Sequence, residues 1–259
     1  MGAVVGGWRL SCGGVRVWRM GVATRAGGWL AITLEIWFSA SIAYNGSMRL
    51  YLSSHGIGTQ EERLKALVGD NKKMLFIDNA KDDLPLVERA GHVREKMMEF
   101  HDLGFDCHEL DLREYFGRSE ILEKIVAAAG LVWVSGGNTF LLRRAMHYSG
   151  LDTILTNLLR EDALVYGGSS AGTIVMTKTL HGVENADNPY VVPEEYEEEI
   201  IWTGLGLIYP QLIPHFNSTA FKDEAQALAD FYETNGLKYE TLEDGQVYIV
   251  ADGIEEKIG

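Results

Sequence analysis

The stretch ALVYGGSSAGTIVMTKTL, residues 163–180, contains the motif that decides the fold. An apolar run ends at two glycines, two serines follow, and a segment of helical character begins at Ala171. Gly168, Ser170 and Gly172 match the pattern G-x-S-x-G, which marks a sharp turn from a buried strand into a helix. The stretch therefore predicts a strand–turn–helix unit of a parallel α/β sheet, with Ser170 rather than Ser169 at the centre of the turn.

Outward from this unit, short apolar runs alternate with longer segments of helical period from Met48 onward. The expected strands are 49–53, 74–79, 105–110, 131–135 and 163–167, and the expected helices between them are 59–69, 84–104, 119–130 and 138–150. Parallel strands need crossover helices, and these crossovers are right-handed. The order predicts an α/β domain with a three-layer, doubly wound, mostly parallel sheet.

Capping signals refine several of these elements. Thr59 and Glu62 have the spacing of a capping box, and Ser218 is placed to cap a helix within residues 218–236. A short helix is expected over residues 171–177. Residues 238–253 predict a β-hairpin or two short strands around a turn at residues 243–245.

The first 47 residues differ from the rest of the chain. They contain four arginines, and Glu35 is their only acidic residue. An apolar run ending in small residues at 41–43 resembles a signal peptide, although Glu35 interrupts it. The preferred interpretation is an N-terminal extension over residues 1–47, a leader or a non-native start, followed by a single domain over residues 48–259.

Composition narrows the possible partners. A net charge of -14 argues against nucleic acid or an anionic membrane as a partner, because both would be repelled. The two cysteines, Cys12 and Cys107, lie far apart in sequence and form neither a disulfide framework nor a metal-binding cluster. We therefore expect a cytoplasmic protein, monomeric or homodimeric, without metal or cofactor.

Ser170 is the candidate nucleophile. A serine on such a turn projects clear of the sheet, and the free amides at the helix start can stabilise an oxyanion. The amide of Ala171 is the first candidate donor, and Gly136 or Gly137, at another strand end, could supply a second.

A serine hydroxyl needs a general base, and that base needs an acid to orient it. Of seven histidines, only His215 follows a predicted strand end with turn-forming residues, so it is the candidate base. Asp244, in a turn between apolar strands, and Asp187, in the loop ENADNPY, are the two candidate acids, with Glu243 beside Asp244.

Three motifs in this order resemble the peptidase E (aspartyl dipeptidase) family of serine peptidases: GGNTF at 136–140, GSSAG at 168–172 and IPHF at 213–216. The resemblance implies a fold similar to class I glutamine amidotransferases, which is flavodoxin-like. It implies Ser170 as nucleophile, His215 as base, and Gly137 and Ala171 as the oxyanion hole. Asn138 and Thr139 would contact the substrate. Asp244, in EDGQ, is the preferred third member of the triad, and Asp187 the alternative.

The resemblance implies a serine peptidase that hydrolyses dipeptides or short peptides. Members specific for Asp-X carry an arginine soon after the histidine, whereas this chain offers only Lys222 there. Arg143 and Arg144 are expected on a solvated helix face. Two alternatives remain open: an esterase-like α/β-hydrolase using Ser170, Asp187 and His215, and a non-catalytic amidotransferase-like binding module.

Overall fold

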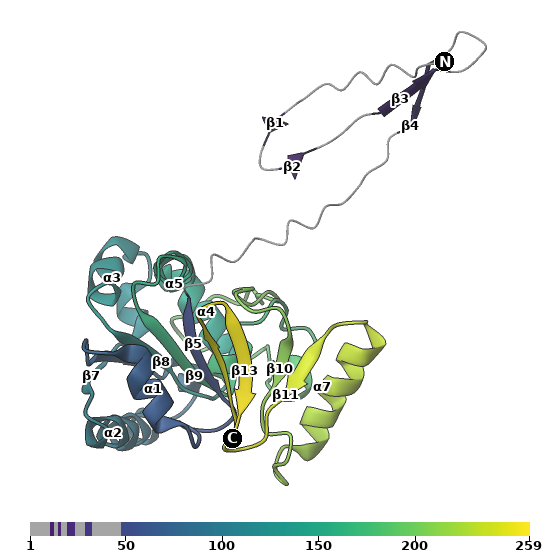
Figure 1. Ribbon diagram of the computed structural model, residues 1–259. Coiled ribbons are helices and arrows are strands. Elements are labelled where there is room, and N and C mark those ends of the chain that lie inside the picture. Colours follow the sequence, from purple (N-terminus) through teal and green to yellow (C-terminus); the bar gives the residue numbers. More distant parts are fainter. Residues whose placement is uncertain (1–10, 13–14, 17–19, 24–28, 33–47) are drawn as a thin grey trace. The chain divides into compact units, whose positions relative to one another are not determined.

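The computed structural model describes residues 11–12, 15–16, 20–23, 29–32 and 48–259, in two compact units, Met1–Tyr44 and Asn45–Gly259 (Figure 1). In the first unit, β1 (Ser11–Cys12) pairs with β2 (Val15–Arg16), and β3 (Met20–Ala23) pairs with β4 (Trp29–Ile32), both antiparallel. The signal-peptide-like residues 41–43 lie outside the described residues. Among the described helices, none has the length and apolar character needed to span a membrane.

Residues 48–259 form a central sheet that, among the described residues, has seven strands in the order β13-β12-β5-β9-β8-β6-β7. The strands from β5 to β7 in this order are mutually parallel, whereas β12 pairs antiparallel with β5 and with β13. Their bounds are β5 Arg49–Ser53, β6 Lys73–Ile77, β7 Asp106–Glu109, β8 Leu131–Val134, β9 Val165–Ser169, β12 Val247–Ala251 and β13 Ile254–Ile258. The fold is therefore α/β and mostly parallel, as predicted.

Helices cover both faces of this sheet. The helices described within residues 48–259 are α1 Glu61–Val68, α2 Leu86–Asp102, α3 Ser119–Val126, α4 Thr139–Ser149, α5 Leu151–Arg160, α6 Ala171–Ile174 and α7 Lys222–Thr234, with 3-10 turns η1 Asn79–Lys81, η2 Leu112–Tyr115 and η3 Val183–Asn185. Successive strand residues face opposite sides. Leu50 and Leu52 accordingly pack with α3, α4 and α5, and Tyr51 packs with α1 and α2. These are the three layers of a flavodoxin-like fold.

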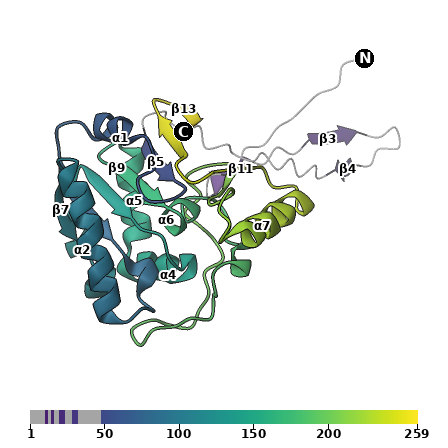
Figure 2. The same ribbon diagram turned by 90° about the horizontal axis from the view of Figure 1, so that it is seen from below.

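A smaller parallel pair, β10 (Gln211–Ile213) and β11 (Tyr239–Thr241), carries α7 between its strands. In Figures 1 and 2, α7 lies at the end of this domain opposite to α2. The short strands expected within 238–253 are therefore present, but they do not form a hairpin. Thr241 ends a strand paired with β10, whereas Val247 begins a strand in the central sheet. The turn at residues 243–245 thus connects two sheets.

Two predicted helix caps are wrong. The Thr59 hydroxyl donates to the Gly245 carbonyl oxygen (3.0 Å), so it does not cap α1, whose cap residue is Gln60. Helix α7 begins after Phe221, three residues beyond Ser218. In both cases tertiary contacts or loop geometry outweigh a local cap worth about 1 kcal/mol. Helix α5, which follows α4 directly after Gly150, was not predicted from the sequence.

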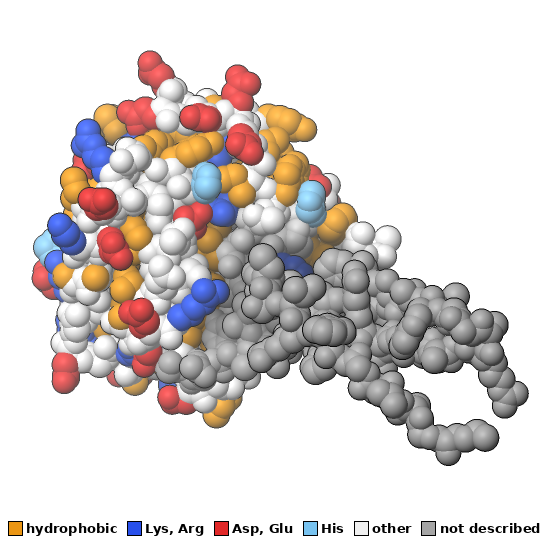
Figure 3. All heavy atoms as spheres, turned by 90° about the horizontal axis from the view of Figure 1, so that it is seen from above, with side chains coloured by type: hydrophobic (Ala, Val, Ile, Leu, Met, Phe, Trp, Pro, Cys, Tyr) orange, Lys and Arg blue, Asp and Glu red, His pale blue; other side chains and the backbone are white. Residues whose placement is uncertain are grey.

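The surface agrees with the acidic composition. Figure 3 shows acidic side chains over much of the visible face, interspersed with lysine, arginine and hydrophobic side chains.

Candidate active site

Four strand ends bring the candidate site together. Ser53 ends β5, Val134 ends β8, Ser169 ends β9 and Ile213 ends β10. In open α/β sheets, ligands bind beyond the carboxyl ends of the parallel strands. The residues that follow these four ends, and the loop after β11 that carries Asp244, can therefore meet around a ligand.

Ser170 occupies the sharp turn that the G-x-S-x-G motif predicts. Its φ of 52° and ψ of -110° lie in a region that costs a non-glycine residue about 1–3 kcal/mol. Glycine is needed beside it, because a Cβ at Gly172 would collide with the Val134 carbonyl and one at Gly168 would lie 2.6 Å from the Gly172 oxygen. The turn is strained and tightly packed, which holds the serine hydroxyl in one place.

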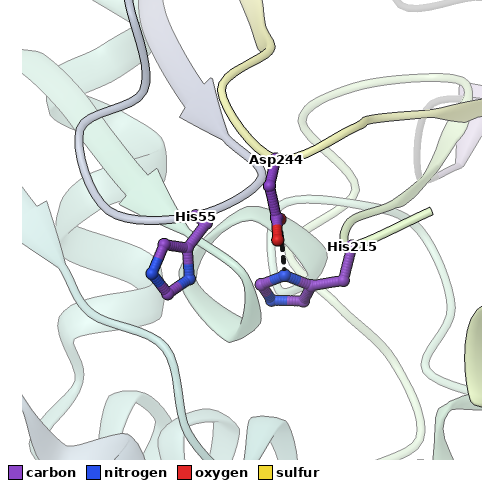
Figure 4. Close-up of side chains that lie close together, drawn as sticks. All are labelled: His55, His215 and Asp244. Atoms are coloured by element: carbon purple, nitrogen blue, oxygen red, sulfur yellow. Dashed lines mark hydrogen bonds and ion pairs between the residues drawn. The ribbon is translucent and has the colours of Figure 1, made fainter. Parts of the chain in front are cut away.

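The structure brings Ser170, His215 and Asp244 into one hydrogen-bonded chain. The Ser170 hydroxyl lies 3.0 Å from His215 Nε2, and His215 Nδ1 lies 2.8 Å from Asp244 Oδ1 (Figure 4 draws the second contact). In the neutral tautomer with the proton on Nδ1, that nitrogen donates to the aspartate and Nε2 accepts from the serine. This is the order of contacts that activates a serine hydroxyl.

Ser54 fixes the two partners of the serine. Its hydroxyl donates to Asp244 Oδ1 (2.9 Å) and accepts from the backbone amide of His215 (2.8 Å). The amide of Asp244 in turn donates to Asn217 Oδ1 (2.8 Å). His215 itself has a left-handed backbone, with φ of 62°, and its ring packs against Phe221 with centroids 4.9 Å apart. These contacts limit the orientations that the imidazole and the carboxylate can adopt.

Burial controls the protonation of His215. Loss of solvent lowers the pKa of the imidazole, and nearby His55 lowers it further. The hydrogen bond and the negative charge of Asp244 raise it, but the net pKa lies below the usual 6.5. The ring is therefore neutral at pH 7 and can accept a proton.

Two backbone amides near Ser170 lack acceptors. Within residues 48–259, the N–H groups of Gly137 and Ala171 donate to no protein acceptor. Gly137 has φ of 143°, and a Cβ there would collide with the Ala80 carbonyl. Gly136 lies so close to Ser170 that a Cβ added at Gly136 would be only 2.9 Å from the Cβ of the serine. Both amides are thus without a protein acceptor, one following Ser170 in the chain and one in the glycine loop that packs against it.

A buried ionic cluster contacts the loop that contains Gly136 and Gly137. The Asp78 side chain is fully buried and accepts from Ser135, Lys81 and His92. Lys81 also donates to the carbonyl oxygen of Gly136. The Gly136 carbonyl is therefore tied to η1, which restrains the direction of the adjacent amides.

A cavity of about 290 Å³ opens beside these groups. It is lined by Ser170, His215 and both loop glycines, by aromatic side chains including Phe76, Trp133 and Phe221, and by His55, Lys81, His92 and Lys96. Neither His55 nor His92 was predicted from the sequence as a site residue. A usable signal existed for His55, which lies two residues beyond a predicted strand end, whereas His92 reaches the cavity from the middle of α2.

Asn138, Thr139 and Asp187 do not line this cavity. The side-chain oxygen Oδ1 of Asn138 caps α4 by accepting from the amides of Phe140 and Leu141, and the side-chain nitrogen Nδ2 donates to the carbonyl oxygen of Asn188 (2.9 Å). The Asp187 carboxylate accepts from the amide of Thr139 (2.8 Å) and has no contact with His215. Burial raises the pKa of Asp187 despite that hydrogen bond.

Arg143 and Arg144 are buried, so the expected solvated helix face is wrong. Arg143 binds Asp152 and the Thr203 carbonyl, and Arg144 donates to the carbonyl oxygens of residues 189, 191 and 199. Guanidinium groups can satisfy several carbonyls at once, which explains their burial in the absence of a substrate carboxylate. Lys222 is exposed and lies outside the cavity lining.

Comparison with known proteins gives concordant results. A peptidase E from Nostoc is 27% identical over 228 residues, covering 82% of this chain and 86% of the relative. A Drosophila melanogaster protein named "Probable alpha-aspartyl dipeptidase" is 30% identical over 129 residues, covering 48% and 50%. A solved structure from Listeria monocytogenes, assigned to peptidase E, superposes with a TM-score of 0.65 at 17% identity, covering 82% of this chain and 98% of that one.

The family model of peptidase family S51 matches residues 51–257, which is most of the chain and all strands of the central sheet except the first two residues of β5 and the last of β13. The match includes Ser170, His215 and Asp244, and the solved neighbour shares the fold. The chain belongs to peptidase family S51.

Proposed function

We propose that this protein is a serine dipeptidase in which Ser170 is the nucleophile, His215 the general base and Asp244 the acid that orients it. The observation that carries the proposal is the hydrogen-bonded chain from Ser170 through His215 to Asp244, with distances of 3.0 and 2.8 Å. The names of relatives, peptidase E and alpha-aspartyl dipeptidase, support the reaction class.

The reaction proceeds by acyl transfer. His215 Nε2 takes the hydroxyl proton as Ser170 attacks the peptide carbonyl, and Asp244 stabilises the imidazolium that forms. The amides of Gly137 and Ala171 donate to the oxyanion. His215 then gives the proton to the leaving amine, the C–N bond breaks, and water hydrolyses the acyl-enzyme by the same steps.

The cavity supports a short substrate. A volume of about 290 Å³ suits a dipeptide or short peptide better than an extended chain. Both cavity lysines already have partners: Lys81 binds Asp78 and the Gly136 carbonyl, and Lys96 binds Glu99 (2.8 Å). We therefore do not include a requirement for an aspartyl side chain in the proposal.

The cellular context follows from the sequence alone. We propose a cytoplasmic enzyme, monomeric or homodimeric, that does not act on nucleic acid, because the chain is acidic and its two cysteines are far apart. Residues 1–47 would be an extension that the peptidase domain does not use. Mass analysis of the native N-terminus tests whether this segment is kept.

Active-site labelling tests the nucleophile. A fluorophosphonate probe should label the wild-type enzyme at Ser170, and Ser170→Ala should abolish labelling and lower turnover of a dipeptide panel by a factor on the order of 10⁴–10⁶. Ser169→Ala is the matched control, because the neighbouring serine also lines the cavity but lacks the contact with His215. Unchanged turnover in Ser170→Ala would refute the proposal.

The alternatives make different predictions. A non-catalytic binding module would leave Ser170 unlabelled. The esterase-like alternative needs Asp187 beside His215, whereas Asp187 binds the α4 amide of Thr139.

A further inference from the structure

His55 lies beside the candidate triad and has no assigned role. Its ring and that of His215 have centroids 5.7 Å apart, and within residues 48–259 its ring nitrogens make no hydrogen bond. A ring nitrogen of His55, a ring nitrogen of His215 and a carboxylate oxygen of Asp244 lie within 4.8 Å of one another. Figure 4 shows the three side chains converging from separate loops.

The loop that carries His55 is joined to both other groups. Ser54, the preceding residue, binds the His215 amide and Asp244 Oδ1, so the three positions share one hydrogen-bonded support. The Ser53 hydroxyl also donates to the His55 carbonyl (3.1 Å). The loops that carry His55, His215 and Asp244 are therefore held together by the same hydrogen bonds, with the three ligand atoms within 4.8 Å of one another.

Two imidazoles and one carboxylate are a ligand set that Zn²⁺ prefers, with water in the fourth position. Zinc–ligand bonds of about 2.0–2.2 Å place tetrahedral ligand atoms roughly 3.3 Å apart. His215 and Asp244 are closer than this, at 2.8 Å, and would separate slightly as the ion enters between them. We propose that His55, His215 and Asp244 form an inhibitory site for Zn²⁺.

Zinc at this site would stop the reaction because it binds a ring nitrogen of His215 that catalysis needs. This effect rests on the proposed function. If the ion binds Nδ1, the remaining ring proton lies on Nε2, which then cannot accept the proton of Ser170. If it binds Nε2, the ion occupies the lone pair that the serine needs. In the first case the ion takes the place of the Nδ1 proton, which moves to Nε2, and in the second it replaces the hydrogen bond from Ser170 while the proton stays on Nδ1, so the neutral ring keeps one proton in both cases.

Zinc titration of the full chain tests this site. Dipeptide turnover by the wild-type enzyme should fall to zero as ZnCl₂ is added, EDTA should restore it, and MgCl₂ at the same concentration should have no effect. His55→Asn should raise the zinc concentration for half-inhibition at least about tenfold, measured against that variant's own zinc-free rate. His101→Asn, an exposed histidine on α2, should respond like the wild type.

Binding measured without catalysis separates this proposal from the proposed function. Calorimetric titration of ZnCl₂ into Ser170→Ala should show one site per chain that is weakened at least about tenfold by adding His55→Asn. Equal zinc affinity with and without His55 would overturn the site, whether or not the protein proves to be a peptidase. Zinc binding that depends on His55 but leaves turnover unchanged would overturn the inhibition.

Discussion

Asp244 and Asp187 are two acidic residues that the sequence alone could not rank decisively. Both lie in turns rich in polar residues, one after His215 in the chain and one before it. In the structure Asp244 binds the imidazole of His215 at 2.8 Å, whereas Asp187 binds the backbone amide that starts α4 at 2.8 Å. Two equally short hydrogen bonds thus have different partners: one fixes the imidazole of His215 and the other caps the start of α4.

The two carboxylates differ in their hydrogen-bond partners and in their access to solvent, and not in the length of the hydrogen bond. Asp244 remains about one-third exposed and also accepts from Ser54. Asp187 is more enclosed, and its burial raises its pKa. A carboxylate that stabilises an imidazolium must stay ionised, and the setting of Asp244 suits that task better.

Of substitutions at the two carboxylates, Asp244→Asn should have the largest effect. The amide cannot stabilise the imidazolium and favours the wrong tautomer of His215, so kcat should fall by a factor on the order of 10⁴ while the fold is kept. Steady-state kinetics on a dipeptide measures this, and circular dichroism checks the fold. A loss below tenfold would remove Asp244 from the triad.

Asp187→Ala should act on stability instead. It leaves the start of α4 without its acceptor, which should lower the free energy of unfolding by about 1–3 kcal/mol, measured by urea denaturation. Asp187→Asn keeps an acceptor oxygen and is the matched control, with kcat expected within about tenfold of the wild type. A collapse of kcat in Asp187→Asn at full stability would instead favour the esterase-like alternative.

The pH profile of kcat/KM tests the environment of His215. The base must be neutral in the free enzyme, so activity is lost as pH falls through its pKa. Because burial lowers that pKa below 6.5, the acid limb should have its midpoint below pH 6.5. A midpoint at or above 6.5 would mean that the attraction of Asp244 outweighs burial.

Removal of residues 1–47 should have the smallest effect. Among the described residues, the buried core of the sheet domain begins with Met48 and its first strand with Arg49, and the family match begins at residue 51. We expect kcat/KM and Tm of the shortened chain to equal those of the full chain. A large loss of either would show that the N-terminal segment takes part in the peptidase fold or its site.

Much of the site could be predicted because the backbone conformation that it requires depends on residues close by in the sequence. A serine with φ of 52° needs small neighbours, and Gly168 and Gly172 show this in the sequence. A base at a strand end is expected in a parallel sheet, which identified His215. The burial of Arg143 and Arg144 could not be predicted, because the carbonyls that they bind lie 45 to 60 residues away along the chain.

The sequence by itself therefore determined the mostly parallel sheet, the nucleophile turn and the likeness to one peptidase family. These features depend on periodicity and on short motifs that nearby residues dictate. Tertiary structure alone decided which acid meets His215 and that His55 joins them. Those contacts depend on the paths of the loops after β5, β10 and β11, and a loop's path is set by packing that no local pattern encodes.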